Sequence, residues 1–332
     1  MKILVTGGAG YIGSHAVKGL LEKGYEVVVT DNLETGHVEA VPSNIPLYIG
    51  DIRNRDFLDN VFKKENIEGV IHFAAHSLVG ESVLNPLKYF HNNTYGLMVL
   101  LDVMKARNVD KIVFSSTAAT YGEPKNIPIS EEEPTIPTNP YGESKLMMER
   151  MMKWADKAYG IRYVSLRYFN VAGASLDGSI GEDHRIETHL IPLVLQTALG
   201  LRENITIFGD DYATKDGTCI RDYIHIVDLI NAHILALEYL MKNNESNIFN
   251  LGSEAGYSVK EIIDTAKKVT KLPIHIVQGE RRAGDPSILI ASSKKVKAVL
   301  GWNPQHTNIR EIIETAWNWH KTHPNGYSGV SY

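Results

Sequence analysis

The sequence has little cysteine and no long apolar run. Its one cysteine, Cys219, cannot form a disulfide within the chain of 332 residues, and this usage is typical of a reducing compartment. No apolar stretch is long enough to span a bilayer. A strand predicted at residues 2–6 leaves no room for a signal peptide before it. We therefore expect a cytoplasmic protein with no membrane partner.

Basic clusters and metal-binding motifs are missing as well. The net charge is −5 and no block of Lys and Arg stands out, so we expect no nucleic-acid partner. The 13 histidines contain no HExxH or similar spacing. His184 and His189 lie in a polar segment that predicts a surface loop. We therefore expect no metal site.

The first residues of the chain carry its most informative pattern. The apolar run 2–6 predicts a buried strand, the glycines Gly7, Gly8, Gly10 and Gly13 follow, and residues 14–23 predict a helix. A strand, a glycine turn and a helix in this order form a site for the pyrophosphate of a dinucleotide. The free N–H groups and the positive dipole end of the helix favour the anion.

The second predicted strand ends in an acid that favours one dinucleotide. Asp31 follows the run Val27–Thr30 and lies 18 residues after Gly13, near the ~20 residues expected for a carboxylate on the adenosine ribose. Such a carboxylate would repel a 2′-phosphate. The sequence therefore predicts NAD rather than NADP.

Apolar runs and helical segments alternate through the first half of the chain. Runs at 2–6, 26–30, 46–49, 69–74, 111–116 and 161–168 predict strands, and segments at 14–23, 54–66, 93–108 and 141–159 predict helices. This alternation predicts an α/β fold with a doubly wound parallel Rossmann sheet. We expect residues 1–170 to bind NAD.

The second half is richer in loops. Loops are predicted at 173–187 and 209–221, and helices at 189–200, 226–243, 258–270 and 308–322. We expect residues 171–332 to form mainly a smaller mixed α/β lobe for the substrate, with crossovers of the chain back to the first domain.

Three side chains could carry acid–base chemistry. Tyr141 and Lys145 are four residues apart on a predicted helix and share one face, and Thr117 lies where the fifth strand ends. Forming a phenolate at pH 7 costs roughly 4 kcal/mol for an ordinary tyrosine, and a nearby ammonium and a positive nicotinamide ring would lower that cost. We predict Tyr141 as the general base, with Thr117 hydrogen-bonded to the same substrate hydroxyl.

The chain resembles the extended short-chain dehydrogenase/reductases, and among them the UDP-glucose 4-epimerase family, to about residue 322. The resemblance is carried by VTGGAGYIGSH, FSSTAATYG, PYGESKLMME, LRYFNVAGA, IFGDDYATKDGTCIRDYIHIVDL and RRAGDPS. It implies interconversion of UDP-glucose and UDP-galactose in galactose metabolism through a transient 4-keto sugar. It also implies a UDP-sugar substrate, a homodimer and an NAD that stays bound through many cycles.

The resemblance assigns residues to both ligands. The positions implied for NAD are Gly7, Gly10, Tyr11, Ile12, Gly13, Asp31, Asn32, Asp51, Ile52, Phe73, Ala74, Ala75, Asn92, Ser115, Tyr141, Lys145 and Phe169. Those implied for the UDP-sugar are Thr117, Asn170, Leu190, Phe208, Arg221, Tyr223, Arg282, Asp285 and Leu289. Arginine suits a diphosphate because it donates two parallel hydrogen bonds.

Several positions depart from the family pattern. Ser77 replaces a Lys that contacts the cofactor, and Thr188-His189 replaces an Asn pair that faces the substrate. Leu289 occupies the position that limits sugar size, where a large Tyr excludes N-acetylated sugars. The smaller Leu predicts that UDP-N-acetylhexosamines are accepted too.

Three other functions remain open. A nucleotide-sugar 4,6-dehydratase would need an acid pair after the active-site Thr, where this chain has Ala118 and Ala119. A 4-epimerase of another sugar nucleotide, a uronate or a pentose, is not excluded, because a fold does not set the substrate. A non-catalytic NAD sensor would have no need of Tyr141, Lys145 and Thr117.

Overall fold

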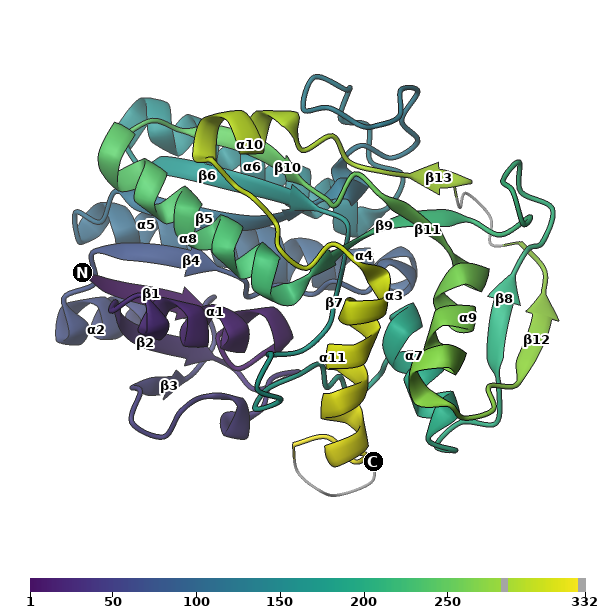
Figure 1. Ribbon diagram of the computed structural model, residues 1–332. Coiled ribbons are helices and arrows are strands. Elements are labelled where there is room, and N and C mark those ends of the chain that lie inside the picture. Colours follow the sequence, from purple (N-terminus) through teal and green to yellow (C-terminus); the bar gives the residue numbers. More distant parts are fainter. Residues whose placement is uncertain (282–285, 328–332) are drawn as a thin grey trace.

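The large sheet lies at the centre of the molecule (Figure 1). The computed structural model describes residues 1–281 and 286–327. Seven strands, all paired in parallel, run in the order β10-β6-β5-β4-β1-β2-β3. Their bounds are β1 Lys2–Thr6, β2 Glu26–Asp31, β3 Leu47–Ile49, β4 Gly69–His72, β5 Lys111–Thr117, β6 Arg162–Tyr168 and β10 Asn247–Leu251.

The chain changes direction across this sheet between β1 and β4. From β1 it winds outward to β2 and β3, then returns to β4 on the other side of β1 and continues outward. In open parallel sheets, ligands bind at such a switch point, beyond the carboxyl ends of the strands. The topology therefore places the candidate site at the ends of β1 and β4.

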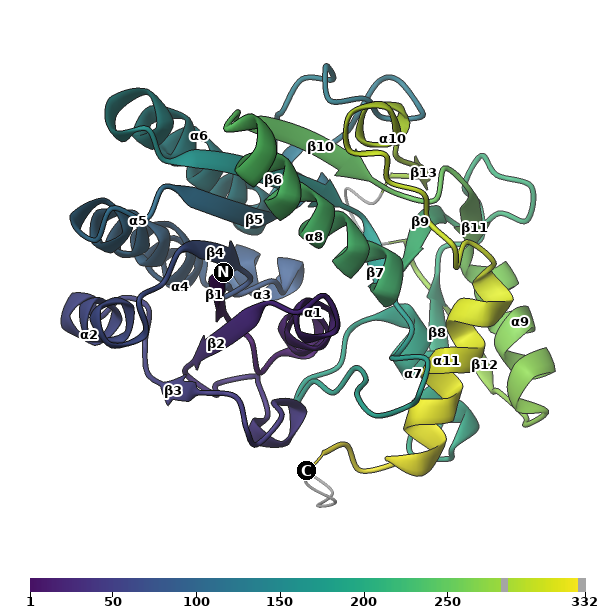
Figure 2. The ribbon, with the colours of Figure 1, turned by 60° about the vertical axis from the view of Figure 1, so that its left-hand side comes forward.

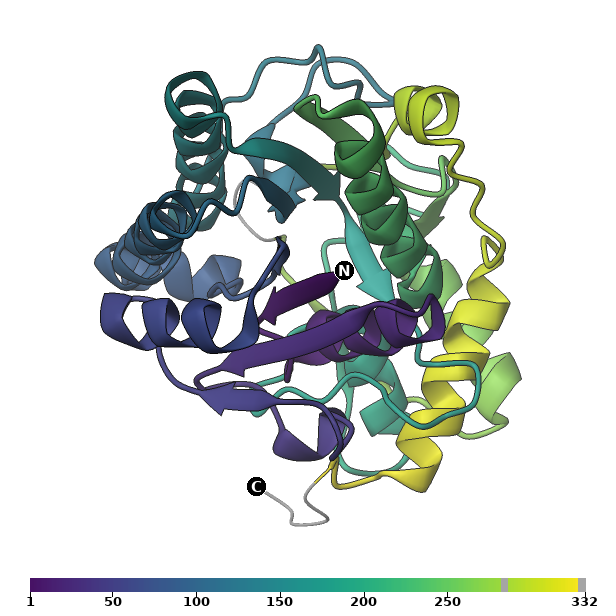
Figure 3. The same cartoon turned by 90° about the vertical axis from the view of Figure 1, so that its left-hand side faces the viewer.

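Helices cover both faces of the sheet (Figures 2 and 3). On one face, α1 (Tyr11–Glu22) and α8 (Ile226–Asn243) share a core with Ile3 and Val5 of β1. On the other, α2 (Arg55–Glu65), α5 (Gly96–Ala106) and α6 (Pro140–Tyr159) share a core with Leu4. Alternate residues of a strand point to opposite faces, which is why a continuous apolar run is buried on both sides.

A smaller lobe lies beyond the carboxyl ends of the strands. There β9 pairs with β7, β11 and β13, and β8 pairs with β12. Three helices, α7, α9 and α11, share its core. Its elements are β7 Asn170–Ala172, α7 Leu190–Ala198, β8 Ile205–Phe208, β9 Ile220–His225, β11 Gly256–Ser258, α9 Val259–Thr270, β12 Ile276–Gly279, β13 Ile288–Leu289 and α11 Ile309–Thr322. The helix α10 Lys294–Leu300 packs instead with α8 and β10 of the large domain.

Short helical segments fill the connections near the site. They are η1 Val38–Ala40, α3 Val79–Leu84, α4 Pro86–Tyr89, the π-helical turn η2 Phe90–Tyr95 and η3 Ala118–Thr120. Within the described part of the chain, no helix has both the length and the apolar character needed to cross a membrane.

The α/β fold with a parallel central sheet is confirmed, and the structure corrects its details. The six predicted runs each form a strand of the large sheet, but the seventh strand, β10, was missed. The first helix begins at Tyr11 and not at residue 14, because Tyr11, Ile12 and Gly13 already form its first turn. The predicted helix 93–108 is α5 preceded by η2, and β9 begins at Ile220, inside a predicted loop.

Candidate active site

Most of the residues predicted for NAD lie at the carboxyl edge of the sheet. The glycine turn follows β1, Asp31 ends β2, Phe73 follows β4, Ser115 and Thr117 lie at the end of β5, and Phe169 follows β6. Parallel pairing aligns these ends, with Thr6 opposite His72 and Thr117 opposite Tyr168. The fold therefore gathers residues spread over about half of the chain.

Two glycines of the first turn are required by close packing. Gly7 has φ +73°, and a Cβ on it would lie 2.6 Å from the backbone nitrogen of Ala74. A Cβ on Gly13 would lie 2.0 Å from the carbonyl oxygen of Gly7. A Cβ on Gly10 would meet no protein atom nearer than 3.5 Å. Packing within the protein therefore does not require a glycine at position 10. Close approach of a ligand to the backbone explains why a glycine is present there.

The N-terminus of α1 is built to receive an anion. Its N-cap is Gly10, which offers no side-chain hydrogen bond to the first turn, and no acid lies in that turn. The first N–H groups of a helix have no partner within the helix, and the dipole makes this end positive. The residues present therefore fit a dinucleotide pyrophosphate at this turn.

Asp31 is buried and already bonded to the glycine turn. Its Oδ2 accepts a hydrogen bond from the backbone N–H of Ala9 (3.0 Å), and its Oδ1 accepts one from Leu33 (2.8 Å). Burial raises the pKa of Asp31 above its usual value, and these amide hydrogen bonds oppose the rise. The carboxylate thus holds the turn in shape, and its predicted bond to a ribose stays a prediction.

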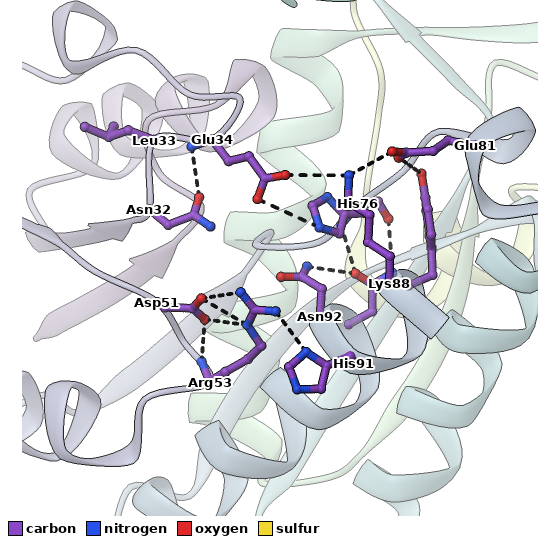
Figure 4. Close-up of polar contacts among 12 residues, drawn as sticks. Asn32, Leu33, Glu34, Asp51, Arg53, His76, Glu81, Lys88, His91 and Asn92 are labelled. Atoms are coloured by element: carbon purple, nitrogen blue, oxygen red, sulfur yellow. Dashed lines mark hydrogen bonds and ion pairs between the residues drawn. The ribbon is translucent and has the colours of Figure 1, made fainter. Parts of the chain in front are cut away.

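Charged side chains line the region predicted for the adenosine half (Figure 4). Arg53 forms an ion pair with Asp51 and lies 2.9 Å from Nδ1 of His91. Hydrogen bonding from Arg53 lowers the pKa of Asp51. Nearby, Lys88 Nζ lies 3.6 Å from Glu34, which places an ion pair between the loop after β2 and α4.

Asn92 lies on the π-helical turn η2 and is buried. Its Nδ2 donates to Oδ1 of Asn93 (3.1 Å), and Asn93 in turn bonds the backbone of His76 and Oγ of Ser144. A π turn inserts an extra residue into a helix and is frequent at functional sites. Here it directs two consecutive asparagines into the protein, although the sequence shows no sign of the turn.

Thr117 and Tyr141 come together from β5 and the start of α6. Both side chains are buried or nearly so. Asn139 caps α6 by accepting from the N–H of Gly142 (2.9 Å), which fixes the helix start at Pro140. Burial raises the pKa of the Tyr141 phenol, and hydrogen bonding with Thr117 lowers it.

Lys145 is fully buried one turn further along α6. Its Nζ donates to the carbonyl oxygen of Ser115 (2.8 Å) and lies 4.9 Å from the ring centre of Phe114. Burial lowers the pKa of Lys145 to about 7, while the carboxylate of Glu149 acts in the opposite direction. Among the described residues, the group that lowers the pKa of Tyr141 is Thr117, so the expected effect of Lys145 is not seen in the protein alone.

A buried ion pair supports this part of the site and was missed in the sequence. Glu149 Oε1 accepts from Nε of Arg167 (2.9 Å) and from Oγ of Ser116 (2.6 Å). The side chains of Glu149 and Arg167 are 4% and 5% exposed. Breaking such a pair would leave a buried charge unpaired. It connects α6 to β5 and β6 next to Lys145.

Strand pairing in the small lobe brings four of the predicted substrate residues onto one sheet. Asn170 of β7 is opposite Tyr223 of β9, and Leu289 of β13 is opposite Arg221 of β9. Phe208 ends β8 in the separate two-stranded sheet, and Leu190 opens α7. Arg282 and Asp285 lie outside the described residues, so the structure says nothing of these two predictions.

The loop before α7 holds a cluster that the sequence analysis did not predict. Donor atoms of Glu182, His184, Glu187 and His189 all lie within 4.8 Å of one another, a grouping able to hold a metal ion. The expectation of no metal site is not tested by this grouping, and the expected surface position holds for His189, which is half-exposed, but less so for His184, which is 26% exposed and packs against Tyr11. The Glu-x-His-x-x-Glu-x-His spacing was the available signal.

The chain is similar to known epimerases over nearly its whole length. Residues 3–252 match the NAD dependent epimerase/dehydratase family. The UDP-glucose 4-epimerase of Lacticaseibacillus casei is 60% identical over 327 residues, or 98% of this chain and 99% of that protein.

Solved structures show the same likeness in three dimensions. A UDP-glucose 4-epimerase crystal structure has a TM-score of 0.97 at 57% identity, covering 98% of this chain and 99% of that one. The Bifidobacterium longum UDP-glucose 4-epimerase, in complex with NAD⁺ and UDP, has a TM-score of 0.93 at 41% identity, covering 98% and 100%. The small lobe is therefore included in the likeness.

Proposed function

The chain belongs to the NAD-dependent epimerase/dehydratase family, and from this premise we propose that it is an epimerase that interconverts UDP-glucose and UDP-galactose with NAD as its cofactor. The observation that carries the proposal is the meeting of Thr117, Tyr141 and Lys145 with the glycine turn at one edge of the sheet. Similarity to UDP-glucose 4-epimerases over 98% of the chain supports the choice of substrate.

We assign the NAD site to the carboxyl edge of the large sheet. The turn Gly7–Gly13 with the start of α1 would hold the pyrophosphate, and Asp31 and Asn32 the adenosine ribose. Asp51 and Ile52 would lie beside the adenine. Phe73, Ala74, Ala75, Asn92, Ser115, Lys145 and Phe169 would surround the nicotinamide half. When bound there, NAD supplies a hydride acceptor and donor for carbon 4 of the sugar.

The protein's own residues would move the proton. The phenolic oxygen of Tyr141 would take the proton of the sugar 4-hydroxyl, and the Thr117 hydroxyl would hydrogen-bond the same oxygen. Burial alone makes Tyr141 a poor base, so the positive charge of the oxidised cofactor is needed to lower its pKa. Lys145, with its pKa lowered to about 7, would hold the nicotinamide ribose by hydrogen bonding.

The small lobe would hold UDP while the sugar turns. Inversion at carbon 4 requires the 4-keto sugar to present its opposite face before Tyr141 returns the proton. The residues proposed to anchor the nucleotide are Asn170, Leu190, Phe208, Arg221, Tyr223, Arg282 and Asp285. We propose that residues 1–170 bind NAD and that residues 171–332 mainly bind the UDP-sugar. Within the second range, α8 and β10 return to the large sheet.

The proposal is tested with purified protein, UDP-galactose and no added NAD. We expect UDP-glucose to form, and protein denaturation to release NAD, because a redox-neutral cycle leaves the cofactor unchanged. A 4-keto-6-deoxy product would identify a dehydratase instead. Protein that is free of NAD and active only with added NAD would contradict retention of the cofactor.

Replacing Tyr141 separates catalysis from binding. We expect Tyr141→Phe to lower kcat by at least about 10²-fold, the scale of a lost general base, while the NAD content stays the same. Tyr159→Phe, at the exposed far end of the same helix, is the matched control and should keep full activity. Unchanged activity in Tyr141→Phe would refute the assignment of the base.

We propose that UDP-N-acetylhexosamines are also substrates. Leu289 is paired with Arg221, and a leucine leaves more room than the Tyr that excludes N-acetyl groups in the family. UDP-GlcNAc should therefore be epimerised by the unmodified protein, and Leu289→Tyr should reduce that turnover far more than the turnover of UDP-glucose. Absence of UDP-GlcNAc turnover with UDP-glucose turnover intact would contradict the proposal.

We also propose a homodimer in the cytoplasm. Apolar side chains are exposed along two neighbouring helices: Met98 of α5 is 50% exposed, and Met147 and Trp154 of α6 are 40% and 68% exposed. Pairing of these helices across a twofold axis would bury them. Sedimentation should give twice the 37.0 kDa mass of the chain, and a monomer at micromolar concentration would exclude the dimer.

A further inference from the structure

Two glutamates and two histidines lie close together in the loop between β7 and α7. His189 Nδ1 lies 2.8 Å from Oε1 of Glu182 and 3.3 Å from Oε1 of Glu187. His184 Nδ1 lies 3.5 Å from Oε1 of Glu182 and 3.1 Å from Oε2 of Glu187. All four ligands come from eight consecutive residues, 182–189.

These distances are of the size found between ligand atoms of a single metal ion. Zinc binds histidine nitrogen and carboxylate oxygen at about 2.0–2.1 Å, so the ligand atoms of a regular tetrahedral site are about 3.3 Å apart. The four nitrogen–oxygen distances in the loop range from 2.8 to 3.5 Å. The four side chains are thus close enough together for one ion to take a donor atom from each of them.

The two carboxylates of the cluster are buried, and each lies in contact with both imidazoles. The Glu182 and Glu187 side chains are 4% and 5% exposed, and Oε1 of Glu182 has Nδ1 of His189 2.8 Å away. Oε1 of Glu187 accepts from the N–H groups of Thr188 and His189, both at 2.7 Å. Those amides orient Glu187 as outer-shell partners orient a metal ligand. Two buried carboxylates require two positive charges, which either two protonated imidazoles or one divalent ion bound by neutral imidazoles supplies.

We propose that Glu182, His184, Glu187 and His189 bind one divalent transition-metal ion of the zinc type. Two nitrogen and two oxygen donors suit zinc better than calcium or magnesium, which prefer oxygen alone. Four protein ligands make a closed, structural site, and half-exposed His189 provides the entry path. The proposal does not depend on the proposed reaction.

The site would join the two halves of the molecule. The His184 ring packs edge-on against Tyr11, at the start of α1, with 6.3 Å between ring centres. Leu190, the first residue of α7, directly follows His189. An ion in the loop would therefore fix the position of the small lobe relative to the glycine turn, and its contribution is to stability.

The test is metal uptake by the untagged, NAD-containing protein after chelator treatment and removal of the chelator. Titration with Co²⁺ alone should give one equivalent per chain with the visible absorption of a tetrahedral site, and Zn²⁺ alone should displace it. Zn²⁺ should also raise the melting temperature. Glu182→Gln and His184→Gln should each weaken Zn²⁺ binding by at least about tenfold.

His275→Gln is the matched control, because His275 is exposed and lies far along the sequence from the loop. It should bind metal like the unmodified protein. Unmodified protein that binds no metal, or binds it with the same affinity after His184→Gln, would overturn the proposal and leave ion pairs within the loop. If a loop variant fails to fold, Zn²⁺ uptake and the melting shift of the unmodified protein decide.

Discussion

Thr117 and Tyr141 show how much of the site is set by single side chains. The Thr117 hydroxyl accepts from the N–H of Ala119 (3.1 Å) and so begins η3, while it also lowers the pKa of Tyr141. One hydroxyl therefore shapes the loop and adjusts the proposed base. Ser115, which is also predicted to bind NAD, accepts a hydrogen bond from Lys145 at its carbonyl oxygen, and its hydroxyl is hydrogen-bonded with that of Tyr168.

Replacing Thr117 tests its effect on the base. Thr117→Val keeps the shape and removes the hydroxyl, so we expect kcat to fall by about 10²-fold. The rise of kcat with pH should move to higher pH, because the group that lowers the pKa of Tyr141 is lost. Thr117→Ser keeps the hydroxyl and should keep the pH profile. An unshifted profile in Thr117→Val would show that the threonine only supports the loop.

The first turn and α1 act as one element with two separate requirements. Gly13 is needed for packing, since a Cβ would meet the carbonyl oxygen of Gly7, whereas Gly10 has room for a Cβ in the protein alone. The sequence pattern identifies both glycines without distinguishing their roles. The difference becomes visible only when the strand, turn and helix are packed together.

This difference predicts opposite outcomes for two alanine variants. Gly13→Ala should lower the melting temperature and NAD content together, because the backbone must move. Gly10→Ala should fold normally yet lose NAD affinity by at least about tenfold, since only the bound pyrophosphate would meet the new methyl group. Melting curves of NAD-free protein and NAD titrations separate the two effects. Equal NAD affinity in Gly10→Ala would contradict close approach of the phosphates.

The π turn η2 is an element that no periodic pattern revealed. The apolar spacing of residues 93–108 predicts an ordinary helix, because periodicity reports which face is buried and not where a residue is inserted. In the structure, η2 precedes α5 and turns Asn92 and Asn93 inward. Tertiary contacts, above all the bonds of Asn93 to His76 and Ser144, stabilise the turn.

At the scale of the whole molecule, buried histidines couple stability to pH. Burial lowers the pKa of His233 to about 4, against 6.5 in the unfolded chain. The folded protein keeps His233 neutral, while the unfolded chain gains a proton as pH falls below about 6.5. Protonation of His233 in the unfolded chain therefore lowers the free energy of unfolding as pH falls. This loss of stability is complete below about pH 4.

Replacing His233 should make the free energy of unfolding depend less on pH below neutrality. Relative to His233→Gln, the free energy of unfolding of the unmodified protein should fall by about 2 kcal/mol more between pH 7 and pH 5. Denaturant unfolding at both pH values measures the difference. His275→Gln, at an exposed position, should behave like the unmodified protein. Parallel profiles for His233→Gln would mean that His233 titrates alike in both states.

The sequence by itself determined the parts of this protein that rest on local order. Apolar runs between helical segments predicted six of the seven strands, and the glycine turn, Asp31 and Tyr141 with Lys145 located the edge of the sheet that carries the site. These features are recognisable because periodicity, turn chemistry and helical spacing depend on residues near one another in the chain.

Only the tertiary structure determined which residues from distant segments lie close together. Pairing of β7, β9 and β13 placed Asn170, Arg221 and Leu289 on one sheet, and folding of the loop 182–189 brought its carboxylates and imidazoles within 4.8 Å of one another. Burial likewise set the pKa of Lys145 and raised that of Tyr141. Strand pairing and loss of solvent depend on contacts far apart in the chain, and a sequence pattern does not contain them.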